Sequence, residues 1–550
     1  MSHRRVSSKL SLAIGLLLAF ALIAGACGGD DNNDTSGPST TAGKDDPTTP
    51  TTSDFNQAQF DGKPAPGGSI TLGVESAIAT LDPAGSLAQP SDIDAALAIY
   101  DPLIGYDEKG LLIPSLATKW ENTDDLKTWT ITVRTDIKFS DGTPFNAKAV
   151  EAQFTRFLDP ATSCTCAERV AQIDTVKATA DDTVVFTLSK ANAFWSSTLA
   201  GTLGFIASPA ATKKFGKDYA RNPVGTGAFV LTDYNNLILK KNPLYWKKDD
   251  DGKQLPYLDQ ITIKAIPDAR NRLSALESGD VDLIQTADTG TIVDAVKNPE
   301  FKIQKVTGSS STIVLFNLKK EPFSDVRIRR AFAYALNRGE MNRVQYKGSR
   351  QEAYSPFPPY SPFYADVPVP KNDLAEAKKL VAEAKADGVP TSYQAVCIPT
   401  DESRRVLGLV QAQMKKVGLT QENVFQDQAA YVNRIFSKQG DYQIGCFRSA
   451  QIADADGLYN GLYTDQSSNV TFYSNPKVDK ALDAIRATAD SKEQIALLKI
   501  VQEELGKDVP VLATLYDLFG NIYTDKISGL PAPEPWSLGA IKLATVYRKA

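Results

Sequence analysis

The five cysteines are the residues of this chain whose type and spacing point most directly to chemistry. Cys27 stands alone near the start, Cys164 and Cys166 are separated by one residue, and Cys397 and Cys446 lie far apart. A zinc site made of the last four thiolates is one interpretation. Its C-x-C spacing, however, is tighter than the spacing of about two to four residues in structural zinc sites. The N-terminal segment, described below, predicts a chain outside the cytoplasm, where four cysteines favour disulfides instead.

The sequences around two of these cysteines favour one pairing. Cys397 in SYQAVCIP and Cys446 in DYQIGCF each belong to a stretch typical of a short buried strand, and two such strands can be neighbours. We therefore favour a Cys397–Cys446 disulfide, with Cys164 and Cys166 joined to each other or free.

Histidine chemistry is excluded from most of the chain. His3 is the single histidine, and it lies in a segment that we expect to be removed. Its loss excludes Ser-His-Asp and Cys-His catalysis and the commonest metal ligand. We expect no metal site and no cofactor, whereas hydrolysis by a pair of carboxylates remains open.

The first 27 residues have the pattern of an export signal. Arg4, Arg5 and Lys9 precede an uncharged apolar run that ends in small residues before Cys27. The sequence Ala24-Gly25-Ala26-Cys27 resembles a bacterial lipobox, with alanine in place of the preferred leucine, and this resemblance implies lipidation of Cys27. A plain secreted protein and an uncleaved membrane anchor are the alternatives, although the run is short for a membrane span of about 20 residues.

The composition describes an acidic globular body behind a polar tail. Removal of residues 1–26 takes away three basic residues and no acidic residue, so the formal charge changes from −5 to −8. Such a chain has no overall attraction for nucleic acid or for anionic lipid, and we expect no nucleic-acid partner. Residues 27–64 are rich in Asp, Thr, Ser, Pro and Gly and predict a disordered tether. The remainder is too long for a single core.

Strand and helix patterns alternate along that remainder and predict a mixed α/β fold. TWTITVRTDIKF alternates like a half-buried strand, and NAKAVEAQFTRFL has helical spacing, with Val150, Phe154 and either Phe157 or Leu158 on one face. Further helices are predicted in these segments: DARNRLSALESG, DVRIRRAFAYALNRGEM, DLAEAKKLVAEAKADG, RRVLGLVQAQMKKVGL, PKVDKALDAIRATAD and KEQIALLKIVQEELGKDVP.

Eight phrases, in one order along the chain, resemble the family 5 extracellular solute-binding proteins, which include the oligopeptide- and dipeptide-binding lipoproteins of ABC importers. The most specific is FNLKKEPFSDVRIRRAFAYALNR, from Phe316 to Arg338. The others are YDPLIGYDEKGLLIPSLATKW, WTITVRTDIKFSDGTPFNAKAVEAQFTRF, PVGTGAFVL, LKKNPLYW, DQITIKAIPDARNRLSALESGDVDL, FYSNPKVDKALDAI and DVPVLATLY.

The resemblance implies a two-lobed periplasmic-binding-protein-like fold of class II (cluster C type), with an inserted domain. The chain would cross between the lobes near Ser311 and near Val511, and closure about these crossings would trap a solute. The implied divisions are a signal peptide at 1–26, the lipid-anchored tether at 27–64, lobe I at 66–95, 204–312 and 513–550, the inserted subdomain at 96–203, and lobe II at 313–512.

The resemblance also implies ligand-binding residues in the segment CFRSAQIADADG. Relatives carry an aspartate here that pairs with a peptide α-amine and, six residues earlier, an arginine that meets a carboxylate. Asp454 and Arg448 reproduce this spacing, and Asp456 is the alternative to Asp454. Arg448 can instead form an ion pair with one of these acids. The tryptophan that relatives place before the acid is absent, which leaves room for an unusual peptide or a non-peptide solute.

Three other motifs are interpreted as structural elements. Gly225-Thr226-Gly227 predicts a tight bend and not a phosphate loop. The cluster of Arg327, Arg329 and Arg330 predicts a helix start, and KKDDDGKQ an exposed turn instead of a calcium loop. The aromatic loop AYSPFPPYSPFYAD, which begins at Ala353, either lines the cleft or packs against a neighbouring lobe.

Three functions remain open on this basis. The first is a monomeric lipoprotein on the outer face of the cytoplasmic membrane that passes a peptide or other small solute to an ABC permease. The second is a secreted hydrolase that uses two carboxylates, and the third is a sensory or adhesion lipoprotein on the same scaffold. The first requires no catalytic residue.

Overall fold

The computed structural model describes residues 57–549 apart from 86, 88, 108–109, 360, 438–439, 449–454 and 535. Cys27 and Asp454 lie outside the described residues, as does the side chain of Arg448, whose backbone is described. The predictions for the signal peptide, for the lipidation of Cys27 and for Asp454 therefore stay predictions.

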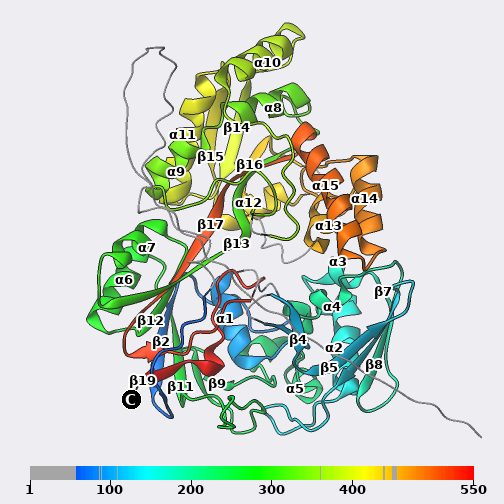
Figure 1. Ribbon diagram of the computed structural model, residues 1–550, viewed down its shortest axis with the longest axis vertical. Coiled ribbons are helices and arrows are strands. Elements are labelled where there is room, and N and C mark those ends of the chain that lie inside the picture. Colours follow the sequence, from blue (N-terminus) through cyan, green and yellow to red (C-terminus); the bar gives the residue numbers. More distant parts are fainter. Residues whose placement is uncertain are drawn as a thin grey trace, which may run out of the picture. The chain divides into compact units, whose positions relative to one another are not determined.

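Within the described residues, a ten-stranded mixed sheet organises the fold (Figure 1). In spatial order its strands are β15 (Thr420–Phe425), β14 (Ser392–Cys397), β16 (Ile444–Arg448), β13 (Phe301–Phe316), β17 (Val511–Thr524), β12 (Leu283–Thr286), β2 (Ser69–Val74), β11 (Gln260–Ala265), β10 (Ile238–Lys241) and β9 (Phe229–Asp233).

The long strands β13 and β17 connect the two halves of this sheet. They pair in antiparallel fashion, and their register shifts between Thr307 and Ser311, opposite Leu518 and Tyr516. Before the shift, β17 also pairs with β12, and beyond the shift β13 pairs with β16. This register shift lies close to the crossing expected near Ser311, whose position stays a prediction. In β17 the register shift lies at residues 516–518. The crossing expected near Val511 is earlier in this strand, at the end of the ladder where Val511 pairs with Leu315.

The segment between α1 (Pro90–Ile99) and β9 builds a smaller sheet with a core of its own. Its strands are β5 (Ala117–Asn122), β6 (Thr128–Val133), β8 (Thr183–Leu188) and β7 (Ile173–Ala178), in that spatial order. Buried aromatic residues hold this sheet to the helix α2 (Ala147–Leu158): Trp129, Phe154, Phe157, Phe186 and Trp195. A separate core is what an inserted subdomain requires, although the exact limits of the predicted domains stay a prediction.

The helix α2 illustrates how these sequences select their structure. The side chain of Asn146 accepts a hydrogen bond from the backbone N–H of Ala149, 3.2 Å away, and caps the first turn. Val150, Phe154 and Phe157 are buried. Leu158 is 37% exposed, so Phe157, of the two residues that the spacing allows, completes the buried face.

Each further segment that the sequence predicts as helical contains a helix, with one difference, and the structure also has helices that the sequence analysis does not predict. DVRIRRAFAYALNRGEM forms two helices instead of one, since Asn337 interrupts the first and caps the second. The bounds are α3 Ala167–Val170, α4 Trp195–Thr198, α5 Pro209–Phe215, α6 Ala269–Ser278, α7 Thr289–Val296, α8 Val326–Ala335, α9 Arg338–Tyr346, α10 Leu374–Ala386, α11 Asp401–Lys415, α12 Gln428–Ile435, α13 Asp456–Leu462, α14 Pro476–Arg486 and α15 Ser491–Asp508.

Residues 57–65 are held against the body of the fold, which corrects the end of the expected tether at 27–64, while its residues 27–56 stay a prediction. Gln59 forms a bridge with Leu530, and β1 (Pro64–Ala65) pairs with β19 (Tyr547–Lys549), which in turn pairs with β18 (Ile527–Ser528). A fourth, two-stranded sheet joins β3 (Ile104–Tyr106) and β4 (Leu112–Pro114). The polar composition that predicts the tether is therefore compatible with edge pairing in its last residues.

The motifs interpreted as structural elements lie in bends and at a helix start. A side chain added at Gly225 or Gly227 would overlap backbone atoms of Ile99, so the bend needs glycine for close packing. Arg327 pairs with Asp325 and Asp387 at the start of α8. Arg329 is buried, not exposed, and donates to the carbonyl oxygens of Phe323, Ser324 and Asp508.

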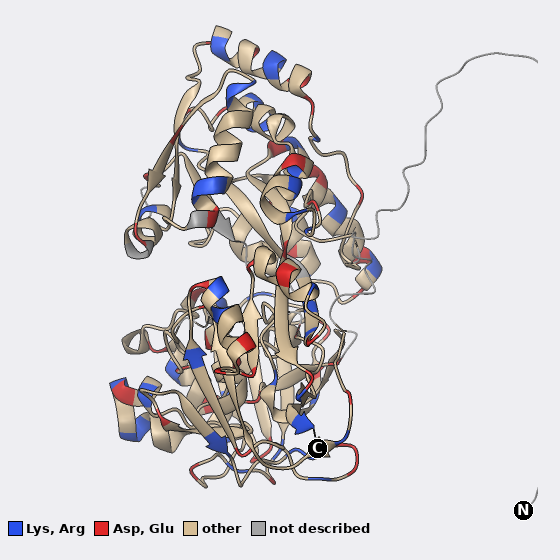
Figure 2. Ribbon diagram, turned by 90° about the vertical axis from the view of Figure 1, so that its left-hand side faces the viewer, with Lys and Arg blue, Asp and Glu red and all other residues tan. Residues whose placement is uncertain are grey.

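Basic and acidic residues are scattered over the helices and strands in Figure 2, in keeping with their near balance in the sequence. Among the helices that the structure describes, none combines the length and the hydropathy of a membrane span.

Candidate binding cavity

A cavity of about 540 Å³ lies beside the C-terminal part of β13 and the N-terminal part of β17. Ser311, Ile313 and Leu315 line it from β13, directly after the register shift, and β17 contributes Val511, Leu512 and Ala513. The volume falls within the range of small-molecule sites, roughly 300–1,000 Å³. The strands that connect the two halves of the sheet therefore also form part of the cavity wall.

The aromatic loop lines this cavity in part and packs in part, so both interpretations of it hold. Tyr354, Ser355 and Pro356 line the cavity. Phe357 is buried, and its ring centroid lies 5.5 Å from that of Phe363. The hydroxyl of Tyr516 in β17 donates to the carbonyl oxygens of Ser355 and Phe357 at 2.8 and 2.7 Å, which fixes the loop to the crossing strand.

Arg338 is a buried cation in the cavity wall. Its Nε and Nη2 atoms donate to the carbonyl oxygen of Ala513 at 3.0 and 2.8 Å, and its guanidinium lies 4.2 Å from the ring centroid of Tyr354. Burial lowers the pKa of Arg338 to about 10. The side chain therefore remains charged at neutral pH and gives this wall a positive potential.

Arg169 brings a second cation to the wall from a different part of the chain. It belongs to the one-turn helix α3 of the smaller-sheet segment and lines the cavity. Glu168, its neighbour, accepts hydrogen bonds from the backbone N–H groups of Ser467 and Ser468 at 3.0 and 3.5 Å and from the hydroxyl of Ser468. Because Ser468 also lines the cavity, these hydrogen bonds of Glu168 hold α3 at the edge of the cavity.

Two elements that flank the predicted ligand residues in the sequence lie near this cavity. Arg448 ends β16, and its backbone pairs with Thr312 of β13. Gly457 and Leu458, which follow Asp456 in α13, line the cavity. Asp454 follows β16 and precedes α13 in the sequence, and its role as a ligand residue stays a prediction.

Asp456 itself is committed to another partner. Its Oδ1 atom lies 2.5 Å from Nε of Arg486, and the two side chains are 13% and 9% exposed. The guanidinium of Arg486 also lies over the ring of Tyr459, 3.4 Å from its centroid. This ion pair fixes the start of α13, whose next residues face the cavity, and gives Asp456 a positioning role.

A family comparison identifies the class of this protein. The family model described as bacterial extracellular solute-binding proteins, family 5 middle, matches residues 112–470, more than half of the chain. The chain belongs to this family. It is also similar to the glutathione-binding protein GsiB of Escherichia coli, with 27% identity over 478 residues, which cover 84% of this chain and 91% of the relative.

Solved structures share the fold of this solute-binding protein. One is the ABC transporter-associated periplasmic binding protein DppA of Helicobacter pylori with the peptide STSA, at a TM-score of 0.78 and 24% identity, covering 88% of this chain and 99% of that one. Another is the oligopeptide-binding protein AppA of Bacillus subtilis with a nonapeptide, at 0.76 and 22%, covering 89% and 100%. A third is AgaA of A. tumefaciens with agropinic acid, at 0.77 and 24%, covering 88% and 99%. The predicted two-lobed α/β fold is confirmed.

The disulfides of this solute-binding protein lie next to the elements of the cavity. Cys397 and Cys446 are joined across β14 and β16, with their Cα atoms 5.5 Å apart, two residues before Arg448. Cys164 and Cys166 are joined directly before α3, with Cα atoms 5.0 Å apart. One bridge thus supports the start of the loop expected to bind ligand, and the other supports the turn that carries Glu168 and Arg169.

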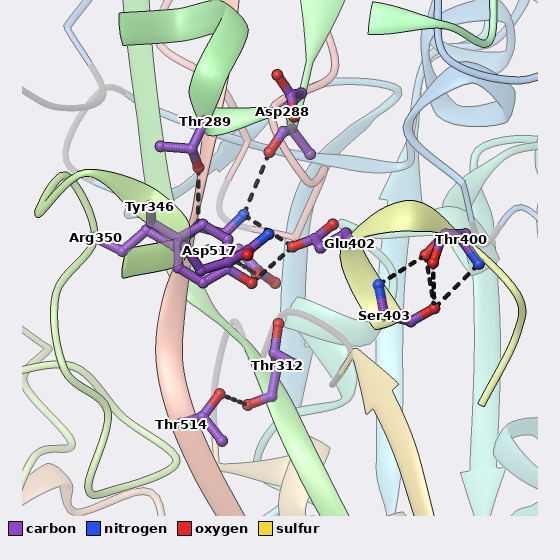
Figure 3. Close-up of polar contacts among 12 residues, drawn as sticks. Asp288, Thr289, Thr312, Tyr346, Arg350, Thr400, Glu402, Ser403, Thr514 and Asp517 are labelled. Atoms are coloured by element: carbon purple, nitrogen blue, oxygen red, sulfur yellow. Dashed lines mark hydrogen bonds and ion pairs between the residues drawn. The ribbon is translucent and has the colours of Figure 1, made fainter. Parts of the chain in front are cut away.

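A buried ion-pair network lies at the register shift of β13 and β17 (Figure 3). Nη1 of Arg350 lies 3.2 Å from Oδ1 of Asp517, and Ser310 donates to Oδ2 of the same carboxylate at 2.6 Å. Arg350 also donates to Oγ1 of Thr289 at 3.0 Å and to the carbonyl oxygen of Ala287 at 3.3 Å. The network therefore joins the β12–α7 segment to both crossing strands.

Sequence reasoning missed Arg169, Arg338 and the Arg350–Asp517 pair. Arg338 stands at a helix start in a quoted family phrase, and Arg169 stands three residues after a cysteine, but neither position carries a local signal for a cavity. Their common location depends on contacts between segments far apart in the sequence. Among the described residues, no group of three or more His, Cys, Asp or Glu side chains is placed to hold a metal ion.

Proposed function

We propose that this protein captures a peptide in the cavity beside β13 and β17 and delivers it to an ABC permease in the membrane. The observation that carries this proposal is the cavity itself, with mostly apolar walls and two arginines, in a chain of the family 5 solute-binding proteins. Apolar walls with a few placed polar groups are the usual composition of a small-molecule site. The relatives with bound peptides and the glutathione-binding relatives give further support.

In this proposal the two ends of the peptide are recognised by opposite charges. Asp454 pairs with the α-amine, and Arg448 contacts a carboxylate or orients Asp454. A bare charge inside a closed cavity is costly unless it is paired. Two described neighbours in the chain support these roles: β16, which ends at Arg448, pairs with the cavity strand β13, and α13, which begins two residues after Asp454, lines the cavity.

Anchoring through a lipid on Cys27 completes the proposal. An anchored receptor stays near its permease, and the polar residues after Cys27 provide reach. Mass spectrometry of the N-terminal proteolytic fragment tests this part directly. A diacylglyceryl-modified Cys27 as the first residue agrees with the proposal, and a fragment that begins at another residue contradicts it.

Titration calorimetry of the purified protein tests the choice of solute. Dipeptides to octapeptides, glutathione and a set of sugars are each titrated into the protein after partial unfolding and dialysis to remove bound solute. Saturable binding of peptides, without their cleavage, agrees with the proposal. Cleavage of a titrated solute would indicate the carboxylate-pair hydrolase.

A non-peptide solute is the second candidate, and one specific observation favours it. The fold that this chain shares with AgaA holds agropinic acid in that protein. The segment RSAQIADADG also has no tryptophan before its acids. Binding of a sugar or a sugar–amino acid conjugate in the same titrations, without binding of any peptide, would select this alternative.

A further inference from the structure

The charges on the described cavity wall are of one sign. Arg169 and Arg338 are the charged residues among those described in the lining, and that part of the wall contains no Asp or Glu. Most of the remaining lining is aliphatic, for example Ile313, Val369 and Leu512. An apolar cavity strengthens the field of each cation because little water is present to screen it. The wall therefore favours a solute that combines an anionic group with apolar surface.

Arg338 contributes charge, but two of its three guanidinium nitrogens are already bonded, and only the buried Nη1 has no hydrogen-bond partner among the described residues. Two of its nitrogens donate to the carbonyl oxygen of Ala513, and its flat face covers the ring of Tyr354. Its residue exposure is 2%. Arg338 is therefore a fixed background cation, which positions the β17 strand and the aromatic loop.

Arg169 has donors to spare. Its side chain is exposed, and its hydrogen bond within the described residues runs from Nη2 to Oγ1 of Thr202, at 3.3 Å. Among the described residues, no carboxylate lies within ion-pair distance of the guanidinium of Arg169. A guanidinium has five N–H donors in a fork that matches a carboxylate. In the part of the chain that the structure describes, most of the N–H donors of Arg169 are thus without a partner beside the cavity.

The surroundings of Arg169 hold its backbone in place. Glu168 is bonded to Ser467 and Ser468, and Val170 is buried in the core of the smaller-sheet segment. The Cys164–Cys166 disulfide closes the preceding turn, whose Thr165 N–H donates to the carbonyl oxygen of Ala84 at 3.0 Å. A fixed backbone limits the entropy lost when the Arg169 side chain binds a ligand.

We propose that Arg169 binds a carboxylate of the solute at the edge of the cavity and thereby selects anionic solutes with apolar side chains. This inference rests on the proposed function and adds the solute class to it. Two parallel N–H···O bonds from the guanidinium would hold the carboxylate. The adjacent Glu168 holds α3 to the Ser467–Ser468 segment. Arg169, which would select the solute, therefore lies in the same helical turn as the residue that holds this turn in place.

Matched pairs of peptides test this inference. Alanine- and leucine-containing dipeptides to pentapeptides, each as a free acid and as its C-terminal amide, are titrated into the mature protein in detergent. We expect the free acids to bind about 10- to 100-fold more tightly than the amides, the range of a charge-assisted hydrogen-bonded contact. Arg169→Gln should remove this difference by weakening the acids and leaving the amides unchanged.

The control is Arg270→Gln, a change at an exposed arginine of α6 outside the cavity lining. It should leave both classes unchanged, and Arg169→Lys should retain part of the preference. Equal affinity of acids and amides for the unchanged protein, or no effect of Arg169→Gln on the acids, would overturn the inference and leave peptide binding intact. Absence of binding for every acid and amide would overturn the inference and the proposed function together.

Discussion

The guanidinium of Arg350 lies 3.2 Å from the carboxylate of Asp517 at the register shift of β13 and β17, and both side chains are buried. Ser310 holds the second oxygen of the carboxylate, and Thr289 and the carbonyl of Ala287 accept from the remaining arginine donors. Each guanidinium nitrogen of Arg350 and each carboxylate oxygen of Asp517 therefore has a hydrogen-bond or ion-pair partner. It fixes the strands at the point where closure of a two-lobed binding protein would bend them.

Replacement of Asp517 should destabilise the fold strongly. Asp517→Asn leaves Arg350 buried without its counter-charge, and we expect the free energy of unfolding to fall by about 3–5 kcal/mol. Urea unfolding followed by circular dichroism measures the change. Asp525→Asn, at an exposed acid beyond the end of β17, is the control and should cost less than about 1 kcal/mol. Equal effects of the two substitutions would show that the buried pair has no special role.

The acid side of the stability profile should contain a contribution from Asp61. Hydrogen bonds from Lys302, and then from Lys549, lower the pKa of Asp61 to about 2. A lowered pKa in the folded state stabilises the fold above the unfolded value of 3.8, and the gain is lost as the pH falls toward 2. The side chain is exposed, so the gain is small.

Comparison with Asp61→Asn isolates this contribution. Melting temperatures of the two proteins should differ at pH 6 and converge as the pH falls from about 4 to about 2. Because Asp61 lies in the segment that binds to β18 and β19, the variant should also release residues 57–62 to proteolysis more readily at neutral pH. A difference in melting temperature that grows toward low pH would contradict the assignment.

The two disulfides should differ in their effect on stability. A cross-link stabilises mainly by restricting the unfolded chain, and its effect grows with the length of the loop that it closes. The Cys397–Cys446 bridge spans 49 residues and the Cys164–Cys166 bridge spans 2. Replacement of both Cys397 and Cys446 by serine should cost about 2–5 kcal/mol, measured by urea unfolding. The corresponding change at Cys164 and Cys166 serves as the comparison, and a larger cost there would refute the loop-length argument.

Asp454 and Asp456 should respond differently to the loss of charge. Asp454→Asn removes the proposed partner of the ligand amine and should weaken binding of an amine-bearing peptide by about 2–5 kcal/mol. Asp456→Asn breaks the ion pair with Arg486, so it should lower the melting temperature while the affinity changes little. Calorimetric titration and thermal unfolding of both variants separate the two roles. Unchanged affinity of Asp454→Asn would place the amine site elsewhere.

Local patterns were sufficient to predict many elements of this fold. The spacing of Val150, Phe154 and Phe157 predicts the buried face of α2, and the strand-like sequences around Cys397 and Cys446 predict neighbouring strands, which the structure joins through their sulfurs. The burial of each of these elements depends on residues within that element, where periodicity carries information about burial.

Features that depend on distant contacts could not be predicted in this way. Residues 57–65 have a tether-like composition, yet their backbone pairs with the C-terminal strands. Arg169 and Arg338 look like ordinary helical arginines, and only the tertiary fold brings both to one cavity. The aromatic loop divides between cavity wall and core because its neighbours, and not its own sequence, decide which ring is buried.

Native mass spectrometry of the protein, purified without unfolding from cells grown on a peptide-rich medium, tests peptide capture most directly. The account predicts bound masses that fragment as short peptides with free carboxyl ends and that leave the protein when it is unfolded. A single bound mass that fragments as a non-peptide solute, and that peptides do not displace, would contradict it.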